Sequence, residues 1–302
     1  MTTIESTAEQ HPALDDVHPS SSGGSITLVI PPAAALVPAR ARQVGGLARV
    51  HPYWSGIAST PDLTTGASPN WGAGTVKSVV PASSVTFHRR SGSFQALSVK
   101  TGRTISGIGP HELAQSEELE ADPFCVDFDL QGLNICWKDG PSYTPDYHAH
   151  NAVRGLVAGE IKAHASYFAD PEYATIMTNA ARTLSSVGIA FDKIDASALH
   201  ENVVRRRNVR RAYGDRFTGF SPRQRDDVLA AIDRDGEVPL GRIHNILGND
   251  PRVGQQIVHA FLCRRVLAYD LDLPVTPVTT VRAAPRASAD YDIRAIRETE
   301  PA

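Results

Sequence analysis

The sequence predicts an α/β protein in two parts: a mixed sheet flanked by helices, followed by a smaller α+β unit. Two observations support this prediction. Strand-like runs alternate with two helical runs between residues 110 and 194, and a basic segment then opens a series of capped helices. The composition is that of a globular protein, with 41% hydrophobic residues, 21% charged residues and a net charge of −3. These values exclude a wholly disordered chain, a coiled coil and a collagen.

The first part is expected to span residues 84–196. Pro110 suits the first turn of a helix, the alternation VDFDL is typical of a strand, and Gly188 is a stop signal for a second helix. In chain order we expect a strand at Ser84–Arg89, a helix at Pro110–Glu120, strands at Val126–Leu130 and Leu133–Trp137, an extended segment at Tyr143–His148, a strand at Leu156–Lys162, a helix at Pro171–Ser186 and a strand at Ile189–Ile194.

The second part is expected to span residues 197–282. Ser221 followed by Pro222 is typical of a helix start, and Asp250 can cap a later helix. We expect helices at Leu199–Tyr213, Ser221–Asp233, Val238–Leu247 and Arg252–Cys263, and then strands at Val266–Leu271 and Val275–Val281. Three helices followed by a β-ribbon is the order of a winged helix-turn-helix.

The flanking segments differ in composition from these two parts. Residues 1–83 are rich in small and polar residues, apart from a strand-like run at Ser25–Ile30, and we expect a largely flexible extension. Residues 283–302 are expected to form a flexible tail. No apolar run approaches the ~20 residues of a membrane helix, and the N-terminus lacks the features of a signal peptide, so we expect a cytoplasmic protein. Cys125, Cys136 and Cys263 match no zinc spacing and are interpreted as reduced core residues.

Acidic and basic residues of the first part form a candidate site. Glu160 and Lys162 lie two apart on a predicted strand, so their side chains point to the same face. Asp146 lies 14 residues upstream of Glu160, which is enough chain for a hairpin that returns it beside Glu160. Glu112 lies in the first turn of a predicted helix.

These residue types suit the hydrolysis of a phosphodiester. Mg²⁺ is commonly held by one or two carboxylates together with water and substrate phosphate, and it makes bound water more acidic. A neighbouring lysine can orient or deprotonate that water. A structural alternative remains open, in which Glu160 and Lys162 are an exposed pair at a strand end and Asp146 is a turn residue.

An ordered set of motifs resembles the TnsA-type transposon endonucleases of the PD-(D/E)XK superfamily. The motifs are Glu112-Leu113, Asp122-Pro123-x-x-Val126, Gln131, Tyr143-Thr144-Pro145-Asp146-Tyr147 and Gly159-Glu160-Ile161-Lys162, and the resemblance extends over residues 84–282. His111 precedes Glu112 where many relatives have serine, so Glu117 or Glu118 is an alternative for the helix carboxylate.

The resemblance implies a restriction-endonuclease-like fold and a Mg²⁺-dependent endonuclease that cuts DNA at transposon ends, with Mn²⁺ expected to substitute. By correspondence, Asp146 and Glu160 would bind the metal and Lys162 would be the catalytic lysine. Glu112 and Gln131 would complete the site. The expected partners are double-stranded DNA, a DDE transposase subunit and an AAA+ ATPase regulator.

The second part carries candidate DNA contacts. The basic helix contains Arg205, Arg206, Arg207, Arg210 and Arg211, which can contact phosphates or can pair with nearby acids. The last helix carries Arg252, Gln255, Gln256 and His259, which can face base edges or a protein partner. We interpret His148, His150 and His164, which flank the candidate site in sequence, as mostly exposed or substrate-facing.

Two rival functions remain open. A stand-alone defence or repair nuclease would use the same site without a transposase. A catalytically inactive, DNA-binding adaptor would keep the fold and lack the reaction.

Overall fold

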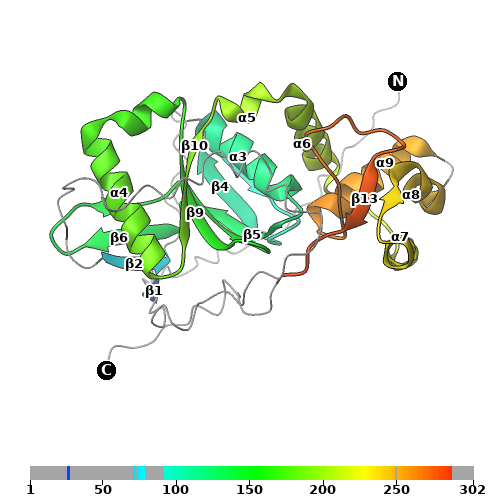
Figure 1. Ribbon diagram of the computed structural model, residues 1–302, viewed down its shortest axis with the longest axis horizontal. Coiled ribbons are helices and arrows are strands. Elements are labelled where there is room, and N and C mark those ends of the chain that lie inside the picture. The colour runs from blue at the N-terminus through cyan, green and yellow to red at the C-terminus, as the bar shows by residue number, and fades with distance from the viewer. Residues whose placement is uncertain (1–25, 28–70, 72–73, 79–91, 249, 288–302) are drawn as a thin grey trace, which may run out of the picture.

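The computed structural model describes residues 26–27, 71, 74–78, 92–248 and 250–287. It is a mixed α/β structure with an elongated arrangement, in which sheets and helix α4 lie at one end and helices α7–α9 at the other (Figure 1). The strand predicted at Ser84–Arg89 lies outside the described residues, as do most of the N-terminal extension and the last part of the tail. Within the described part, no helix is long and apolar enough to cross a membrane.

A four-stranded sheet with the order β10-β9-β8-β5 forms the centre of the first part. Its strands are β5 (Cys125–Leu130), β8 (Tyr147–Asn151), β9 (Gly155–Lys162) and β10 (Ala190–Asp195). β8 pairs antiparallel with both β5 and β9, whereas β10 runs parallel to β9. The parallel pair requires a crossover, which 3₁₀ helix η2 (Ala165–Ala169) and α4 (Pro171–Ser186) supply.

Helices α3 (Gly109–Ala121) and α4 belong to different hydrophobic clusters that meet at β9. Ile161 packs in the cluster that includes Ala114 and Leu119 of α3, and Ala158 packs in the one that includes Ala180 and Leu184 of α4. Residues an odd number of positions apart on a strand point to opposite faces. Apolar side chains on both faces therefore bury β9 and place its charged C-terminal end between the two helices.

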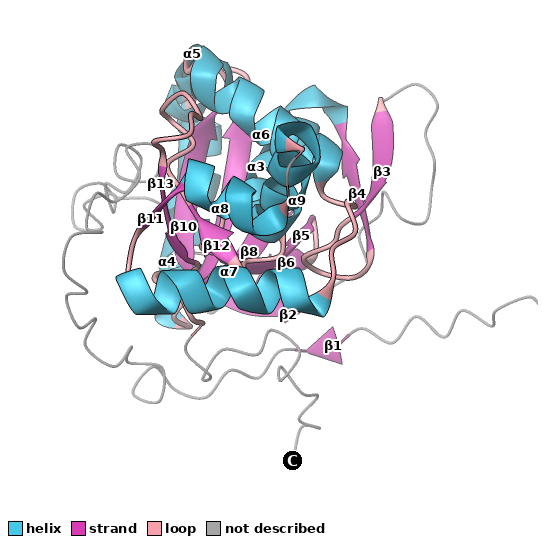
Figure 2. Cartoon of the chain, turned by 90° about the vertical axis from the view of Figure 1, so that its right-hand side faces the viewer, coloured by secondary structure: helices cyan, strands magenta, loops and turns pink. Residues whose placement is uncertain are grey.

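Two smaller sheets flank the central one. Strands β3 (Ser93–Leu97) and β4 (Thr104–Ile108) form a hairpin that leads into α3, and Figure 2 shows β3 at the outer edge of the molecule. A second four-stranded sheet has the order β1-β2-β6-β7. Its strands are β1 (Ile26–Thr27), β2 (Gly74–Ser78), β6 (Leu133–Trp137) and β7 (Ser142–Tyr143). The segment 1–83, expected to be largely flexible, thus contributes two strands to this sheet.

The second part begins with α5 (Ala198–Glu201) and α6 (Val203–Asp215), where one continuous helix was expected. Asn202 separates the two helices and caps α6 by accepting a hydrogen bond from the Arg205 N–H at 3.0 Å. The following elements are α7 (Pro222–Asp235), β11 (Val238–Pro239), α8 (Leu240–Leu247), α9 (Pro251–Cys263), β12 (Leu267–Ala268) and β13 (Thr280–Ala283). Ser221 and Gln224 form a capping box at the start of α7, as the Ser-Pro signal predicted.

The ribbon after α9 differs from its prediction. The expected strand Val275–Val281 is mostly loop, and the strand β13 begins at Thr280. Pro274 and Pro277 interrupt the backbone donors of this stretch, which explains the late start. β13 lies between β11 and β12 and pairs antiparallel with both.

Candidate active site

Asp146, which directly precedes strand β8, lies opposite Glu160 of strand β9. Tyr147 on β8 pairs with Gly159 on β9, so the preceding Asp146 lies across from Glu160. The Oδ2 atom of Asp146 accepts a hydrogen bond of 2.7 Å from the backbone N–H of Ile161. The hairpin anticipated from the 14-residue spacing therefore brings the two acidic residues to the same end of the sheet.

Gly159 allows this close pairing. A Cβ atom at this position would lie 2.4 Å from the ring of Tyr147, which is fully buried. The Tyr147 hydroxyl reaches on to Asp192 of β10 at 3.4 Å, and Arg154 pairs with both oxygens of the same Asp192 at 2.7 Å. The tyrosine thus crosses three strands and fixes the register in which Asp146 meets Glu160.

Glu160 is only 4% exposed and accepts three side-chain hydrogen bonds. Lys162 Nζ lies 2.5 Å from its Oε1 atom, and the Tyr143 hydroxyl donates to Oε2 at 2.6 Å. The Tyr173 hydroxyl, from α4, donates to Oε1. The alternative of an exposed Glu160–Lys162 pair is therefore wrong for the glutamate.

The sequence analysis missed the role of the two tyrosines. Tyr143 is part of a motif without a role of its own, and Tyr173 falls within the helix predicted at Pro171–Ser186. Burial and the neighbouring Glu160 raise the pKa of both phenols above the usual value, so both remain donors to the carboxylate. One signal for this contact is present in the sequence. Tyr173 lies in the first turn of the helix that follows the Glu-x-Lys strand.

Glu112 and Gln131 extend the site on the side of α3. The Gln131 Nε2 atom donates to Glu112 Oε1 at 3.0 Å, and the Ile108 N–H donates to Oε2 at 3.0 Å. Gln131 has a backbone φ of 53°, and its N–H donates to the carbonyl of Asp146 at 2.9 Å. This left-handed conformation costs about 1–3 kcal/mol for a residue with a Cβ atom, and such strain clusters at functional sites.

The site carries three carboxylates and one amine. Burial raises the pKa of Asp146 to about 8, and the charge of Glu160 reinforces this rise. Burial also raises the pKa of Glu112, with a further contribution from Glu160. The charge of Glu160 therefore acts on both Glu112 and Asp146, and Lys162 lowers the two pKa values only in part.

Glu117 and Glu118 lie at the other end of α3 and make different contacts. Glu118 accepts from Arg205 at 2.7 Å, and Glu117 pairs with Arg206 at 2.5 Å. Neither glutamate is the helix carboxylate of the site, and Glu112 has this position. The prediction that Arg205 contacts DNA is wrong, because its side chain is only 6% exposed and bridges Glu118 and Asp272 inside the protein.

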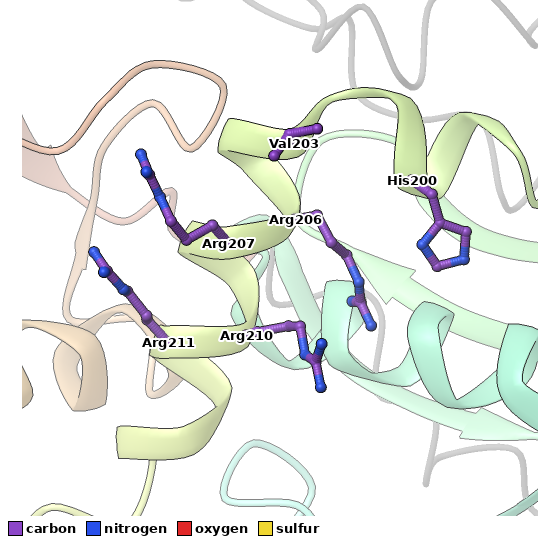
Figure 3. A pocket seen from close by; sticks show the side chains of 6 residues that line it. All are labelled: His200, Val203, Arg206, Arg207, Arg210 and Arg211. Carbon is purple, nitrogen blue, oxygen red and sulfur yellow. The ribbon is translucent and has the colours of Figure 1, made fainter.

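The remaining arginines of α6 line a shallow hollow of about 470 Å³ (Figure 3). Arg207 and Arg211 project to one side of the helix, and Arg206 and Arg210 project to the other side, toward His200. Arg207, Arg210 and Arg211 are exposed, and no described carboxylate forms an ion pair with them. The exposed face keeps its positive charge, whereas Arg205 and Arg206 use theirs inside the protein.

Helix α9 is more enclosed than predicted. Its residues from Ile257 to Cys263 are all buried. Gln255 bonds to His244 at 3.1 Å and to His259 at 2.9 Å, and His259 bonds to Asp215 of α6 at 2.6 Å. Gln255 and His259 therefore join α8, α9 and α6 in a chain of hydrogen bonds, in which His259 is buried and Gln255 is partly buried. Arg252 and Gln256 remain exposed in the first turns.

The three flanking histidines do not share one environment. His150 is buried and His164 is exposed. Burial lowers the pKa of His148 to about 4, so its ring is neutral at physiological pH. The interpretation of these residues as mostly exposed or substrate-facing is wrong for His150, which strand β8 carries into the sheet, whereas His148 is only partly buried.

Neither the arrangement of possible metal ligands nor the comparison with known proteins assigns an activity to this site. Among the described residues, no group of three or more His, Cys, Asp and Glu side chains is arranged to hold a metal ion. The sequence matches no model of a known protein family, and a comparison with curated proteins finds no similar protein. The resemblance to TnsA-type endonucleases therefore stays a prediction that rests on the motifs.

Proposed function

We propose that this protein is a metal-dependent DNA endonuclease similar to the TnsA-type subunits, which hydrolyses phosphodiester bonds at transposon ends. The observation that carries the proposal is the position of Asp146, Glu160 and Lys162 at the end of strand β9, with Glu112 and Gln131 beside them. Five residues that are scattered over fifty positions of sequence form one interacting group in space.

The arrangement of elements supports a restriction-endonuclease-like first part and a winged-helix-like second part. The sheet β10-β9-β8-β5 has the candidate acids at the junction of β8 and β9, and α3 contributes Glu112. In the second part, α7, β11, α8 and α9 are followed by β12 and β13, whose pairing gives the order β11-β13-β12. Helices interrupted by one short strand and followed by a ribbon are typical of winged helices.

The donor set fits a magnesium ion. Asp146 and Glu160 supply hard oxygen ligands, and two carboxylates suffice for Mg²⁺ because this ion keeps several waters and takes substrate oxygens. Burial, reinforced by the charge of Glu160, raises the pKa of Asp146, and a divalent cation at this carboxylate would favour its charged form. When bound, Mg²⁺ would supply an acidified water and neutralise charge on the phosphate.

The protein groups have separable roles in this proposal. Asp146 and Glu160 would hold the metal, and Lys162 would orient or deprotonate the water or contact the phosphate. Tyr143 and Tyr173 fix the Glu160 carboxylate by donating to its two oxygens. Gln131 and the Ile108 N–H hold Glu112 at the edge of the site.

The arginine face of α6 is the proposed contact for double-stranded DNA. Arg207, Arg210 and Arg211 can neutralise phosphates without reading sequence, and such binding weakens with added salt. Arg252 and Gln256 are available for a second contact. A DDE transposase and an AAA+ ATPase are proposed as partners on the strength of the resemblance alone.

A cleavage assay with Mg²⁺ or Mn²⁺ tests the reaction, using supercoiled plasmid with and without a candidate transposase. Asp146→Ala and Lys162→Ala are expected to reduce cleavage by at least about 10²-fold, since each removes a group of the site. Lys138→Ala, in an exposed turn, is the matched control. Cleavage that survives both substitutions would discard the proposed site.

Metal binding gives a readout that needs no partner. Mg²⁺ is expected to raise the melting temperature of the wild type and to have a smaller effect on Asp146→Ala. One observation favours the adaptor as the second candidate: both oxygens of Glu160 are hydrogen-bonded within the protein. DNA binding without metal binding or cleavage would support that candidate.

A further inference from the structure

Lys193 lies next to the candidate site on a strand that the motifs do not include. It pairs in register with Glu160, because β10 runs parallel to β9. Laterally paired residues of neighbouring strands project to the same face of a sheet. The Lys193 side chain therefore leaves the sheet on the same side as Glu160 and Lys162.

Two aromatic rings link the two lysines. Lys162 Nζ lies 4.9 Å from the ring centre of Tyr173, and the Tyr173 and Phe168 ring centres are 6.3 Å apart with an interplanar angle of 30°. Lys193 Nζ lies 5.8 Å from the ring centre of Phe168. Each ammonium group thus lies within the range in which an aromatic face attracts a cation.

The two lysines differ in their counter-ions. Lys162 is paired with Glu160, whereas no ion pair joins Lys193 to any described carboxylate. Asp195, the acid two positions further along the same face of β10, accepts hydrogen bonds from the Ala165 N–H and from Ser197. Lys193 is half-buried, and this burial lowers its pKa. A ring holds an ammonium group in place without forming an ion pair with it, so Lys193 remains available to an external anion.

We infer that Lys193, positioned by Phe168, binds a phosphate of the DNA backbone adjacent to the bond that is cut. This inference rests on the proposed function, because it takes the substrate to be DNA. The position beside Glu160 places the ammonium within reach of the strand that enters the site. A phosphate contact there would fix the register of the strand without contributing to the chemical step.

Binding of a short fluorescent duplex, measured in Ca²⁺ or EDTA over a series of salt concentrations, tests the inference apart from cleavage. Lys193→Ala is expected to lower the affinity about 3–10-fold and to reduce the salt dependence by roughly one phosphate contact. Lys193→Arg should restore most of the affinity, because guanidinium also binds phosphate and stacks on rings. Phe168→Leu keeps the charge and should give an intermediate loss. Lys138→Ala serves as the charge-matched control.

The outcomes separate this inference from the proposed function. Unchanged affinity and salt dependence in Lys193→Ala would overturn the inference, even if the wild type cuts DNA. Weaker binding by Lys193→Ala together with no cleavage by the wild type would support the phosphate contact and reject the nuclease. No DNA binding by the wild type would overturn both. Melting curves of each variant exclude a loss that comes from unfolding.

Discussion

The two ends of helix α3 bury carboxylates in opposite ways. At the C-terminal end, Glu118 and Glu117 pair with Arg205 and Arg206 of α6 at 2.7 and 2.5 Å. At the N-terminal end, Glu112 shares its surroundings with two further carboxylates and only one amine. The glutamates of one helix are thus paired with arginines at its C-terminal end, which we call the balanced end. At its N-terminal end, the crowded end, Glu112 lies among carboxylates that outnumber the nearby cations.

This difference separates a structural use of charge from a functional one. Burial lowers the pKa of Arg205, but the charges of Glu118 and Asp272 more than reverse this effect and raise it above the usual value. Burial raises the pKa of Asp146 to about 8, and the neighbouring Glu160 adds to the rise. Paired buried charges hold α3 against α6, whereas unbalanced ones are typical of sites that await a cation or a substrate.

The largest expected effect comes from breaking the balanced end. Arg205→Leu would leave Glu118 and Asp272 without their shared cation, and the loss of one partner of a buried ion pair costs about 3–5 kcal/mol. The free energy of unfolding, measured by urea denaturation, should fall by this amount. A fall below about 1 kcal/mol would show that the pair does not hold the two parts together.

At the N-terminal end of α3, the crowded carboxylates should make the stability of the protein depend on pH. The Asp146 carboxyl titrates near 8 in the folded protein and near 4 when unfolded. Between these values the native state retains a proton that the unfolded state has lost, so this group makes the protein less stable as pH rises. The wild type should lose up to about 3–4 kcal/mol in the free energy of unfolding relative to Asp146→Asn between roughly pH 5 and pH 8, measured by urea denaturation in EDTA.

Comparison with Asp146→Asn isolates this group from other titrations. The neutral His148, with its pKa lowered to about 4 by burial, makes the protein less stable as pH falls below about 6.5, and it is present in both proteins. Subtraction of the two pH profiles removes its contribution. A difference that is flat, or that grows in favour of the wild type as pH rises, would contradict a crowded site.

Most of the described secondary structure followed from local sequence signals. Proline and capping residues fixed helix α4 at its predicted bounds Pro171–Ser186, and Asp170 caps it at Tyr173 as an N-cap aspartate should. Signals of this kind act within a few residues, so the helix bounds can be predicted from them without knowing which elements pack against the helix. The break at Asn202 and the late start of β13 were missed although both have local causes, since Asn202 caps α6 and Pro274 and Pro277 remove backbone donors from the ribbon.

The candidate site was less predictable than the strands that carry it. Spacing placed Asp146 near Glu160, since a hairpin needs only local chain geometry. The Tyr173 contact depends on how the crossover helix α4 returns over the sheet, which no local pattern specifies. The burial of Arg205 was missed for the same reason, because a run of arginines does not show which of its members faces an acidic helix.

The smallest expected effect distinguishes two neighbouring arginines of α6. Arg206→Ala removes a mostly buried pair with Glu117 and should lower the free energy of unfolding by about 1 kcal/mol, while Arg207→Ala, which is exposed, should change it by less than about 0.5 kcal/mol. DNA affinity should follow the reverse order, with a roughly threefold loss for Arg207→Ala and a smaller one for Arg206→Ala. The two variants should therefore rank in opposite orders for stability and for DNA affinity. If α6 were only a solvated basic face, Arg206→Ala and Arg207→Ala would change both quantities by similar amounts. Equal effects on stability and on binding would show that α6 does not divide its arginines between packing and DNA.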